Sequence, residues 1–256
     1  MAEFKLGRIR FIWKGSWVTA KEYFKDDVVR YGGRTYIVNT GHTSSNFDSQ
    51  IANFDKMADG QEWKGNWALS TVYKPNDVVK YGGYLYIANT GHTSATTTSD
   101  GLELDQSKWD LFCEGFDWLG DWGVTTRYKV NDIVRYGGVM YLCTEAHTSG
   151  ASVGDGLELD QSKWDLFANG LTWLNAWIAT TRYKKGDVVR YGGQVYVCNT
   201  GHTAGADNTA GLEADQAKWD YLHKGIEYLG DWVTGTRYKN NDVVKYGSDL
   251  WICGTY

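Results

Sequence analysis

The sequence predicts an all-β protein made of about five tandem, aromatic-rich modules of roughly 55 residues, each with three strands. The first reason is a repeated motif in which two aromatic residues stand four positions apart. The pairs are Trp13/Trp17, Trp63/Trp67, Trp118/Trp122, Trp173/Trp177 and Tyr228/Trp232, at intervals of 50, 55, 55 and 55 residues. A period of this length is typical of an array of small structural units.

The second reason is composition. The 256 residues include 13 Trp, 18 Tyr and 31 Gly but only one Pro. Runs rich in Val and aromatic residues, separated by Gly and Asn, are typical of short strands joined by tight turns. A unit of this size is close to the limit at which a core is stable alone, and large aromatic side chains compensate because each buries about 150–250 Å².

Within a module, the elements follow in a fixed order. In the third copy, residues 132–136 form a β-branched strand, and Gly137-Gly138 allows the positive φ of a primed hairpin turn. The return strand follows at 139–143, and then a polar loop that contains His-Thr. In copies two to four this loop continues to a closing strand, which begins at Trp109 in the second copy, with Asp105 as the cap of a helical turn before it.

The spacing gives the module boundaries and leaves both ends unmatched. We expect modules 1 to 5 at residues 12–61, 62–116, 117–171, 172–226 and 227–256, preceded by an orphan closing strand at 1–11. An aromatic stands nine residues before each pair: Phe4, Phe54, Trp109, Trp164 and Trp219. Module 5 has no such strand after it. We therefore expect Phe4 and Leu6 to complete module 5 around Trp251, either within one chain as a closed ring or between chains as a filament or larger ring.

Charge and cysteine usage restrict the partners and the compartment. The net charge is −5 and the isoelectric point is near 5.5, which argues against nucleic acid as a partner. No apolar run is long enough to insert into a membrane, and the N-terminus lacks the apolar core of a signal peptide. Cys143, Cys198 and Cys253 occupy equivalent positions, where copies one and two have Val38 and Ala88. This position therefore favours a small apolar group, and reduced thiols indicate synthesis in the cytoplasm.

The order of Trp122, Tyr128, Asp132, the Gly-Gly hairpin, Tyr141 and Trp164 resembles that of the carbohydrate-binding modules of families 5 and 12, which bind chitin and cellulose. The resemblance implies a compact three-stranded unit. It also implies that sugar stacks on adjacent aromatics four and five residues after the second hairpin Tyr. Those positions hold Thr40/Gly41, Thr90/Gly91, Glu145/Ala146 and Thr200/Gly201, so the stacking platform is missing. The tandem modules of this sequence also resemble those found in tail, fibre and decoration proteins of bacterial viruses.

Two repeated positions are candidate ligand contacts. The first aromatic of each pair (Trp13, Trp63, Trp118, Trp173 and Tyr228) either stacks on sugar or packs at the junction between modules, and its position between copies favours the junction. The histidines His42, His92, His147 and His202 either contact a ligand or fix the loop by a hydrogen bond. One His per module, without a second ligand nearby, is a poor metal site. The acidic positions Asp100, Glu103 and Asp105 match no known calcium loop and are explained by turns and caps.

No catalytic residues, metal site or cofactor site is predicted, because the same residues recur in every module whereas enzymes concentrate their chemistry in one place. We expect a non-enzymatic structural or assembly protein, a virion component such as a fibre, tail or decoration protein, that contacts itself or other virion proteins. The alternative is a multivalent adhesin for a cell-surface glycan, in which repetition of weak sites adds avidity. A virion or extracellular location fits both.

Overall fold

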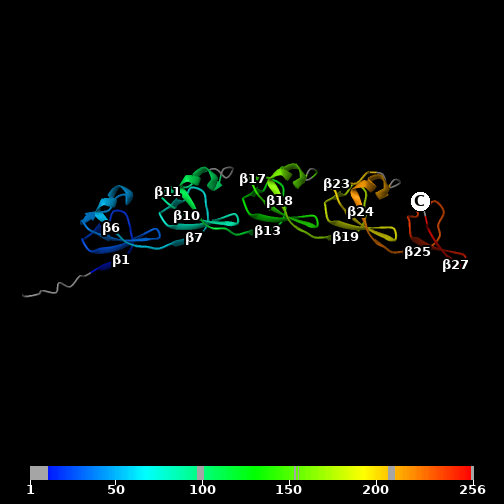
Figure 1. Cartoon of the computed structure of the whole chain (residues 1–256), viewed down its shortest axis with the longest axis horizontal. Coiled ribbons are helices and arrows are strands. Elements are labelled where there is room, and N and C mark those ends of the chain that lie inside the picture. Colours follow the sequence, from blue (N-terminus) through cyan, green and yellow to red (C-terminus); the bar gives the residue numbers. More distant parts are fainter. Residues whose placement is uncertain (1–10, 97–100, 153, 155, 207–210, 255–256) are drawn as a thin grey trace, which may run out of the picture. The chain divides into compact units, whose positions relative to one another are not determined.

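A computed structural model describes residues 11–96, 101–152, 154, 156–206 and 211–254, so Phe4 and Leu6 of the expected closing strand lie outside the described residues. Its strands and short 3₁₀ helices confirm the all-β class and the tandem repetition of small sheets (Figure 1). The chain divides into two compact units, residues 1–116 and 117–256. In the described part of the chain, no helix has the length and apolar character needed to cross a bilayer.

Each sheet is built from a parallel first strand, a hairpin and a closing strand. The first strands are β1 (Ile12–Ser16), β7 (Glu62–Asn66), β13 (Asp117–Asp121), β19 (Thr172–Ala176) and β25 (Glu227–Asp231). The hairpins are β3 (Asp27–Tyr31) with β4 (Arg34–Val38), β9 (Asp77–Tyr81) with β10 (Tyr84–Ala88), β15 (Asp132–Tyr136) with β16 (Val139–Cys143), β21 (Asp187–Tyr191) with β22 (Gln194–Cys198), and β26 (Asp242–Tyr246) with β27 (Asp249–Ile252). The closing strands are β6 (Phe54–Asp59), β12 (Trp109–Cys113), β18 (Trp164–Asn169) and β24 (Trp219–Lys224).

The sheets of modules 1 to 4 therefore have four strands rather than three, in the order β1-β3-β4-β6 and its equivalents. The additional strand is the one that carries the first aromatic of each pair, and it pairs in parallel with the first hairpin strand. Parallel pairing leaves no local turn signal, which is why spacing alone did not reveal it. The sheet of module 5 has three described strands, β25-β26-β27.

A two-stranded ladder and a 3₁₀ helix cover one face of each complete sheet. The ladders are β2 (Glu22–Tyr23) with β5 (His42–Thr43), β8 (Val72–Tyr73) with β11 (His92–Thr93), β14 (Arg127–Tyr128) with β17 (His147–Thr148), and β20 (Arg182–Tyr183) with β23 (His202–Thr203). The helices are η1 (Asp48–Asn53), η2 (Gly101–Lys108), η3 (Leu157–Lys163) and η4 (Gly211–Lys218). Asp105 lies inside η2, at a kink between two turns, and not at the cap that we expected.

The core of each module lies between this cover and the sheet. In module 3 it contains Tyr128, Val134, Cys143, Leu157 and Trp164, all of them buried. The tyrosine hydroxyl reaches back to accept the backbone N–H of Gly123 at 2.7 Å, so the polar end of this buried ring has a partner. Val38, Ala88, Cys143 and Cys198 are at most 1% exposed, which agrees with the need for a small apolar group at this position.

Candidate ligand-binding face

The first aromatic of each pair is exposed. The fractions of residue surface accessible are 60, 59, 54, 53 and 59% for Trp13, Trp63, Trp118, Trp173 and Tyr228. The favoured expectation, packing at the module junction, is therefore wrong in the described structure. These residues lie near the start of an edge strand, and the junction is formed by other groups.

Strand register places each exposed aromatic at one end of a row of side chains on the face opposite the core. In module 3, Trp118 pairs with Ile133, which pairs with Leu142, which in turn pairs with Asp165. Residues directly opposite each other in a ladder share one face of the sheet. The equivalent rows are Trp13–Val28–Ile37–Asp55, Trp63–Val78–Ile87–Asp110, Trp173–Val188–Val197–Asp220 and Tyr228–Val243–Ile252. We call this surface the outer face.

Charged groups surround the aromatic on the outer face. Two residues further along the hairpin strand, each module has Arg30, Lys80, Arg135, Arg190 or Lys245. Arg135 forms a two-point pair with Asp121, with Nε and one terminal nitrogen 2.6 and 3.1 Å from the two carboxylate oxygens. This guanidinium holds the pKa of the Asp121 carboxyl below its usual value. At the other end of the row, Asn39 donates its amide to Asp55 at 3.1 Å.

The outer face thus combines an exposed aromatic plane with hydrogen-bonding groups at fixed positions. In module 4, the indole N–H of Trp173 donates to the Asn175 side chain at 3.1 Å, which orients the ring. The apolar face of a sugar ring stacks on such a plane, while charged and amide side chains accept or donate hydrogen bonds to hydroxyl groups. In module 3, one exposed aromatic beside the Arg135–Asp121 charge pair suits a small, shallow binding site, whereas Ile133 of the row is only 6% exposed.

Contacts between successive modules form around the hairpin tip. The second glycine donates its N–H to a turn of the next module, from Gly33 to Pro75 O at 3.2 Å, from Gly138 to Lys185 O at 3.0 Å, and from Gly193 to Asn240 O at 3.3 Å. The lysine of the same turn lies over the tyrosine that ends the hairpin strand, with Nζ of Lys184 4.6 Å from the centre of the Tyr136 ring. The junction therefore uses a backbone hydrogen bond and a cation–π contact.

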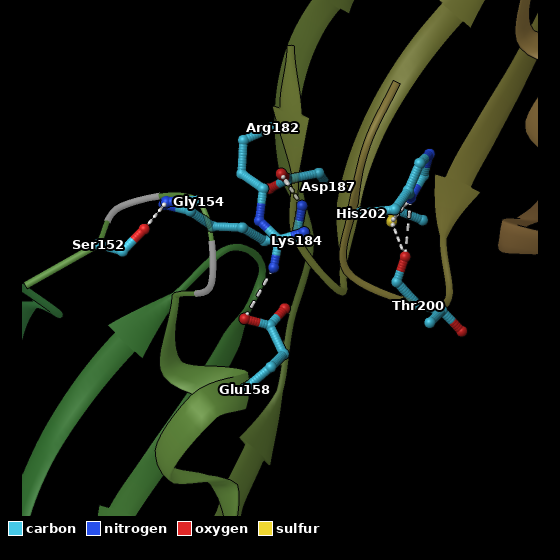
Figure 2. A network of polar contacts seen from close by, with 9 residues as sticks. Ser152, Gly154, Glu158, Arg182, Lys184, Asp187, Thr200 and His202 are labelled. Atoms are coloured by element: carbon cyan, nitrogen blue, oxygen red, sulfur yellow. Dashed lines mark hydrogen bonds and ion pairs between the residues drawn. The ribbon is translucent and has the colours of Figure 1, made fainter. Parts of the chain in front are cut away.

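The junction also occupies the positions at which the related modules stack sugar. Figure 2 shows Glu158, at the start of η3 in module 3, facing Arg182 of module 4, and the two form an ion pair at 3.0 Å. A Cβ atom on Gly201 would lie 1.8 Å from a carboxylate oxygen of Glu158. In module 2, a Cβ atom on Gly91 would lie 3.2 Å from Asp48 of η1. A side chain large enough to stack on sugar has no room at Gly201 unless Glu158 moves.

The repeated histidines hold the loop. In each module, Nδ1 of the histidine donates to the carbonyl oxygen two residues earlier, at 2.7–3.0 Å (Figure 2, His202 and Thr200). The ring packs edge-on against the closing aromatic, 5.3 Å from Trp164 for His147. His147 and His202 are only 4 and 5% exposed, so they are interior residues and not the ligand contacts that we considered. His42 and His92 are half-buried in the same arrangement.

The acidic positions have protein partners. Asp105 accepts the N–H of Ala95 at 2.8 Å, and Asp160 and Asp215 accept equivalent amides. Glu103 accepts the hydroxyl of Tyr81 at 2.7 Å. Asp100 lies outside the described residues. Among the residues that are described, no group of three or more His, Cys, Asp or Glu side chains is placed to hold a metal ion.

Sequence reasoning missed the outer-face row and the charge pair beside it, although one signal was present. Each aromatic is followed by a hairpin strand whose alternate residues are β-branched and basic, a pattern typical of a strand with two covered or functional faces.

Comparison with known proteins finds a similarity in modules 3 and 4, in segments that begin after the outer-face aromatics Trp118 and Trp173. No curated protein matches the chain significantly. Residues 121–153 and 176–219, together less than half of the chain, match the model of carbohydrate-binding module family 5/12. These two segments run from the second aromatic of the pair through the hairpin and, in module 4, to the closing Trp219, and in them the chain is similar to a carbohydrate-binding module.

Proposed function

We propose that this protein binds glycan through its outer face, with one weak site in each module around Trp13, Trp63, Trp118, Trp173 and Tyr228. The observation that carries the proposal is that all five aromatics are more than half exposed at the same place in the sheet. A large aromatic that is left exposed five times costs solubility unless it has a partner. Similarity to carbohydrate-binding modules supports sugar as that partner.

Repetition matters because each site is shallow. One aromatic stacking contact contributes about 0.5–1.5 kcal/mol, so removal of one ring weakens one site by roughly fivefold. Sites on one chain reinforce one another when the ligand is a polymer, since every bound module raises the local concentration of glycan at the next. The ligand class that fits is therefore a repetitive polysaccharide and not a single small sugar.

The test is affinity electrophoresis through gels that contain soluble neutral or acidic polysaccharides. Retardation should fall modestly for Trp118→Ala and should vanish when all five outer-face aromatics are replaced by alanine. Phe24→Lys is the matched control: Phe24 is an exposed aromatic away from the row, and modules 2 to 5 have lysine at this position. A folded five-site variant that is retarded as strongly as the wild-type protein would refute the proposal.

A structural role is the second candidate. Consecutive modules within each unit share the same hairpin-tip hydrogen bond and cation–π contact, an arrangement that suits a scaffold. We propose in this case a non-enzymatic virion component of fibre, tail or decoration type, located on a virion or outside the cell. Immunogold labelling of particles from the producing host would test it, and label confined to the cytoplasm would count against it.

A further inference from the structure

A cavity of about 410 Å³ lies at the junction of modules 3 and 4, and both modules contribute to its walls. Module 3 contributes Asp121, Arg135 and the hairpin-tip Gly137, and module 4 contributes Leu174 and Asp187 among others. Asp121 and Arg135 are the charge pair of the outer face in module 3. The cavity therefore adjoins the outer face and leads from it towards the interior of the junction.

Asp187 brings to this cavity a buried carboxylate with one oxygen unused. The residue is 3% exposed, and its Oδ2 accepts the backbone N–H of Lys184 at 2.8 Å (Figure 2). Its Oδ1 faces the hairpin tip of module 3, since a Cβ atom on Gly137 would lie 3.4 Å from it. Among the described residues, none forms a hydrogen bond or an ion pair with Oδ1. Burial raises the pKa of this carboxyl, although the N–H and the charge of Lys184 lower it. A further cation would stabilise such a buried carboxylate.

The other charged groups at the cavity have partners of their own. Arg135 is held by Asp121 at 2.6 and 3.1 Å, and Arg182 forms an ion pair with Glu158 at 3.0 Å. The ammonium of Lys184 lies 4.6 Å from the centre of a tyrosine ring. The buried carboxylate is thus the charge that remains for a ligand, and it selects a cationic one.

Module 1 shows which group fits against this carboxylate. Lys14 stands at the position of Leu174, and its Nζ lies 3.4 Å from Oδ1 of Asp27, the equivalent of Asp187. In module 2 the position holds Lys64, which pairs with a neighbouring glutamate at 3.2 Å. Modules 3 to 5 have leucine there instead. At the junction of modules 3 and 4, the chain therefore keeps the carboxylate and the space beside it but does not supply the ammonium.

We propose that this cavity binds the ammonium group of an amino sugar, in the place that Lys14 Nζ holds in module 1. Trp173 stands between Thr172 and Leu174 on β19, and both of these neighbours line the cavity. A sugar that stacks on the exposed Trp173 ring is therefore next to the cavity, and so is the next sugar of the same polymer. The net charge of −5 favours a cationic polymer over an acidic one.

The ligand class is thus a polysaccharide with free amino groups. This choice of carrier rests on the proposed glycan binding, whereas the ammonium site itself does not. A lysine side chain of a protein presents the same group, but it offers no ring to stack on the neighbouring aromatic.

The experiment is a nuclear magnetic resonance titration of the full-length protein, in which the amide signals of Gly137, Leu174 and Asp187 are followed at constant ionic strength. Glucosamine, with its amine protonated, should shift these signals in a saturable manner. N-acetylglucosamine, which has no charge, should bind at least about tenfold more weakly, because a hydrogen bond to a charged group contributes about that factor or more.

Two variants locate the site. Asp187→Asn keeps an oxygen for the N–H of Lys184 but loses the charge, so it should weaken glucosamine binding about tenfold. Leu174→Lys should abolish binding, because it places an ammonium against the carboxylate as module 1 does. Leu229→Lys is the matched control: it adds the same charge at the equivalent position of module 5 and should bind glucosamine as the wild-type protein does.

The outcomes separate this inference from glycan binding in general. Equal binding of N-acetylglucosamine, tighter binding of glucuronic acid, or unchanged glucosamine binding in both variants would overturn the ammonium site. Retardation by neutral polysaccharides that depends on the outer-face aromatics would in that case still stand. Methylammonium tests the site without any sugar. If it and N-acetyl-lysine amide bind as tightly as glucosamine, and Trp173→Ala changes none of the three, the amino-sugar assignment is wrong and the ammonium comes from a protein.

Discussion

The second glycine of the hairpin tip should not accept any side chain in a module that is followed by another module. It should accept one in module 5, after which no module is described. A Cβ atom on Gly138 would lie 2.4 Å from the carbonyl oxygen of Gly186 and 2.7 Å from that of Gly170. Both are backbone atoms and cannot rotate away. Module 5 provides a natural comparison, since it has Ser248 at this position and its first glycine, Gly247, has nothing within 4 Å of an added Cβ.

Gly138→Ser should therefore separate modules 3 and 4 without unfolding either core. The change removes the Gly138–Lys185 hydrogen bond, worth about 1 kcal/mol. It also removes the contact of Lys184 with Tyr136, worth about 1 kcal/mol. The Glu158–Arg182 ion pair adds about 0.5 kcal/mol because it is only partly buried. The expected loss of coupling is about 2–3 kcal/mol, or roughly a 30- to 140-fold change in the opening equilibrium.

Hydrogen exchange followed by mass spectrometry measures this change directly. Amides at 137–139 and 184–187 should exchange faster by about that factor, while amides of the β15–β16 hairpin next to Val134 and Cys143 should keep their protection. Ser248→Gly is the matched control and should leave both sets unchanged. Unchanged exchange at 137–139 in a folded Gly138→Ser protein would refute the steric reasoning, as would collapse of the whole module.

Three further outcomes are expected. Trp164→Ala should destabilise module 3 by about 3–5 kcal/mol in urea denaturation, because the Trp164 ring is 5% exposed and its centre lies 5.0 Å from that of Tyr128. Trp118→Ala, at an exposed ring, should change the free energy of unfolding by no more than about 0.5 kcal/mol. Burial raises the pKa of the Cys143 and Cys198 thiols from 9.0 to about 12, so a thiol reagent near neutral pH should modify the exposed Cys113 first and reach the buried pair only on unfolding. Burial likewise raises the pKa of Tyr31 and Tyr136 to about 12. Between about pH 10 and 12 the unfolded state releases protons that the folded state keeps, so the urea midpoint of unfolding should fall as the pH rises. The tyrosinate absorbance of the folded protein should rise late, near the raised pKa.

Features set by neighbouring residues could be predicted from the sequence. The hairpin followed from β-branched runs on either side of Gly-Gly, and the first glycine indeed has a positive φ, +66° at Gly137, as a primed turn requires. The buried Asp before each hairpin also followed from local turn chemistry: Asp132 accepts the N–H of Lys129 at 2.8 Å.

Features set by distant residues could not be predicted. The parallel strand that carries Trp118 is joined to its partner β15 by a loop and a short strand, so no turn signal marks the pairing. The exposure of Trp118 was missed for the same reason. Because Trp118 lies between two repeats in the sequence, we expected it to lie at the contact between two modules in space. The helix kink at Asp160 depends on an amide of the preceding loop, Gly150, ten residues away.

Tandem packing explains why the candidate site lies on the outer face. When a module follows another, its loop at Thr200-Gly201 lies against Glu158 of the module before it, so a projecting aromatic pair at this place would oppose the ion pair with Arg182. The outer face contributes Arg30 and Arg190 to ion pairs with Glu62 and Glu227 of the next module, but it retains an exposed aromatic in every module. A consequence can be measured: the three atoms nearest to a Cβ on Gly41 are backbone atoms of its own module, the first being Tyr23 O at 3.3 Å. An aromatic pair at Thr40 and Gly41 should therefore be accepted with little loss of stability, while the same pair at Thr200 and Gly201 should weaken the junction as strongly as Gly138→Ser does.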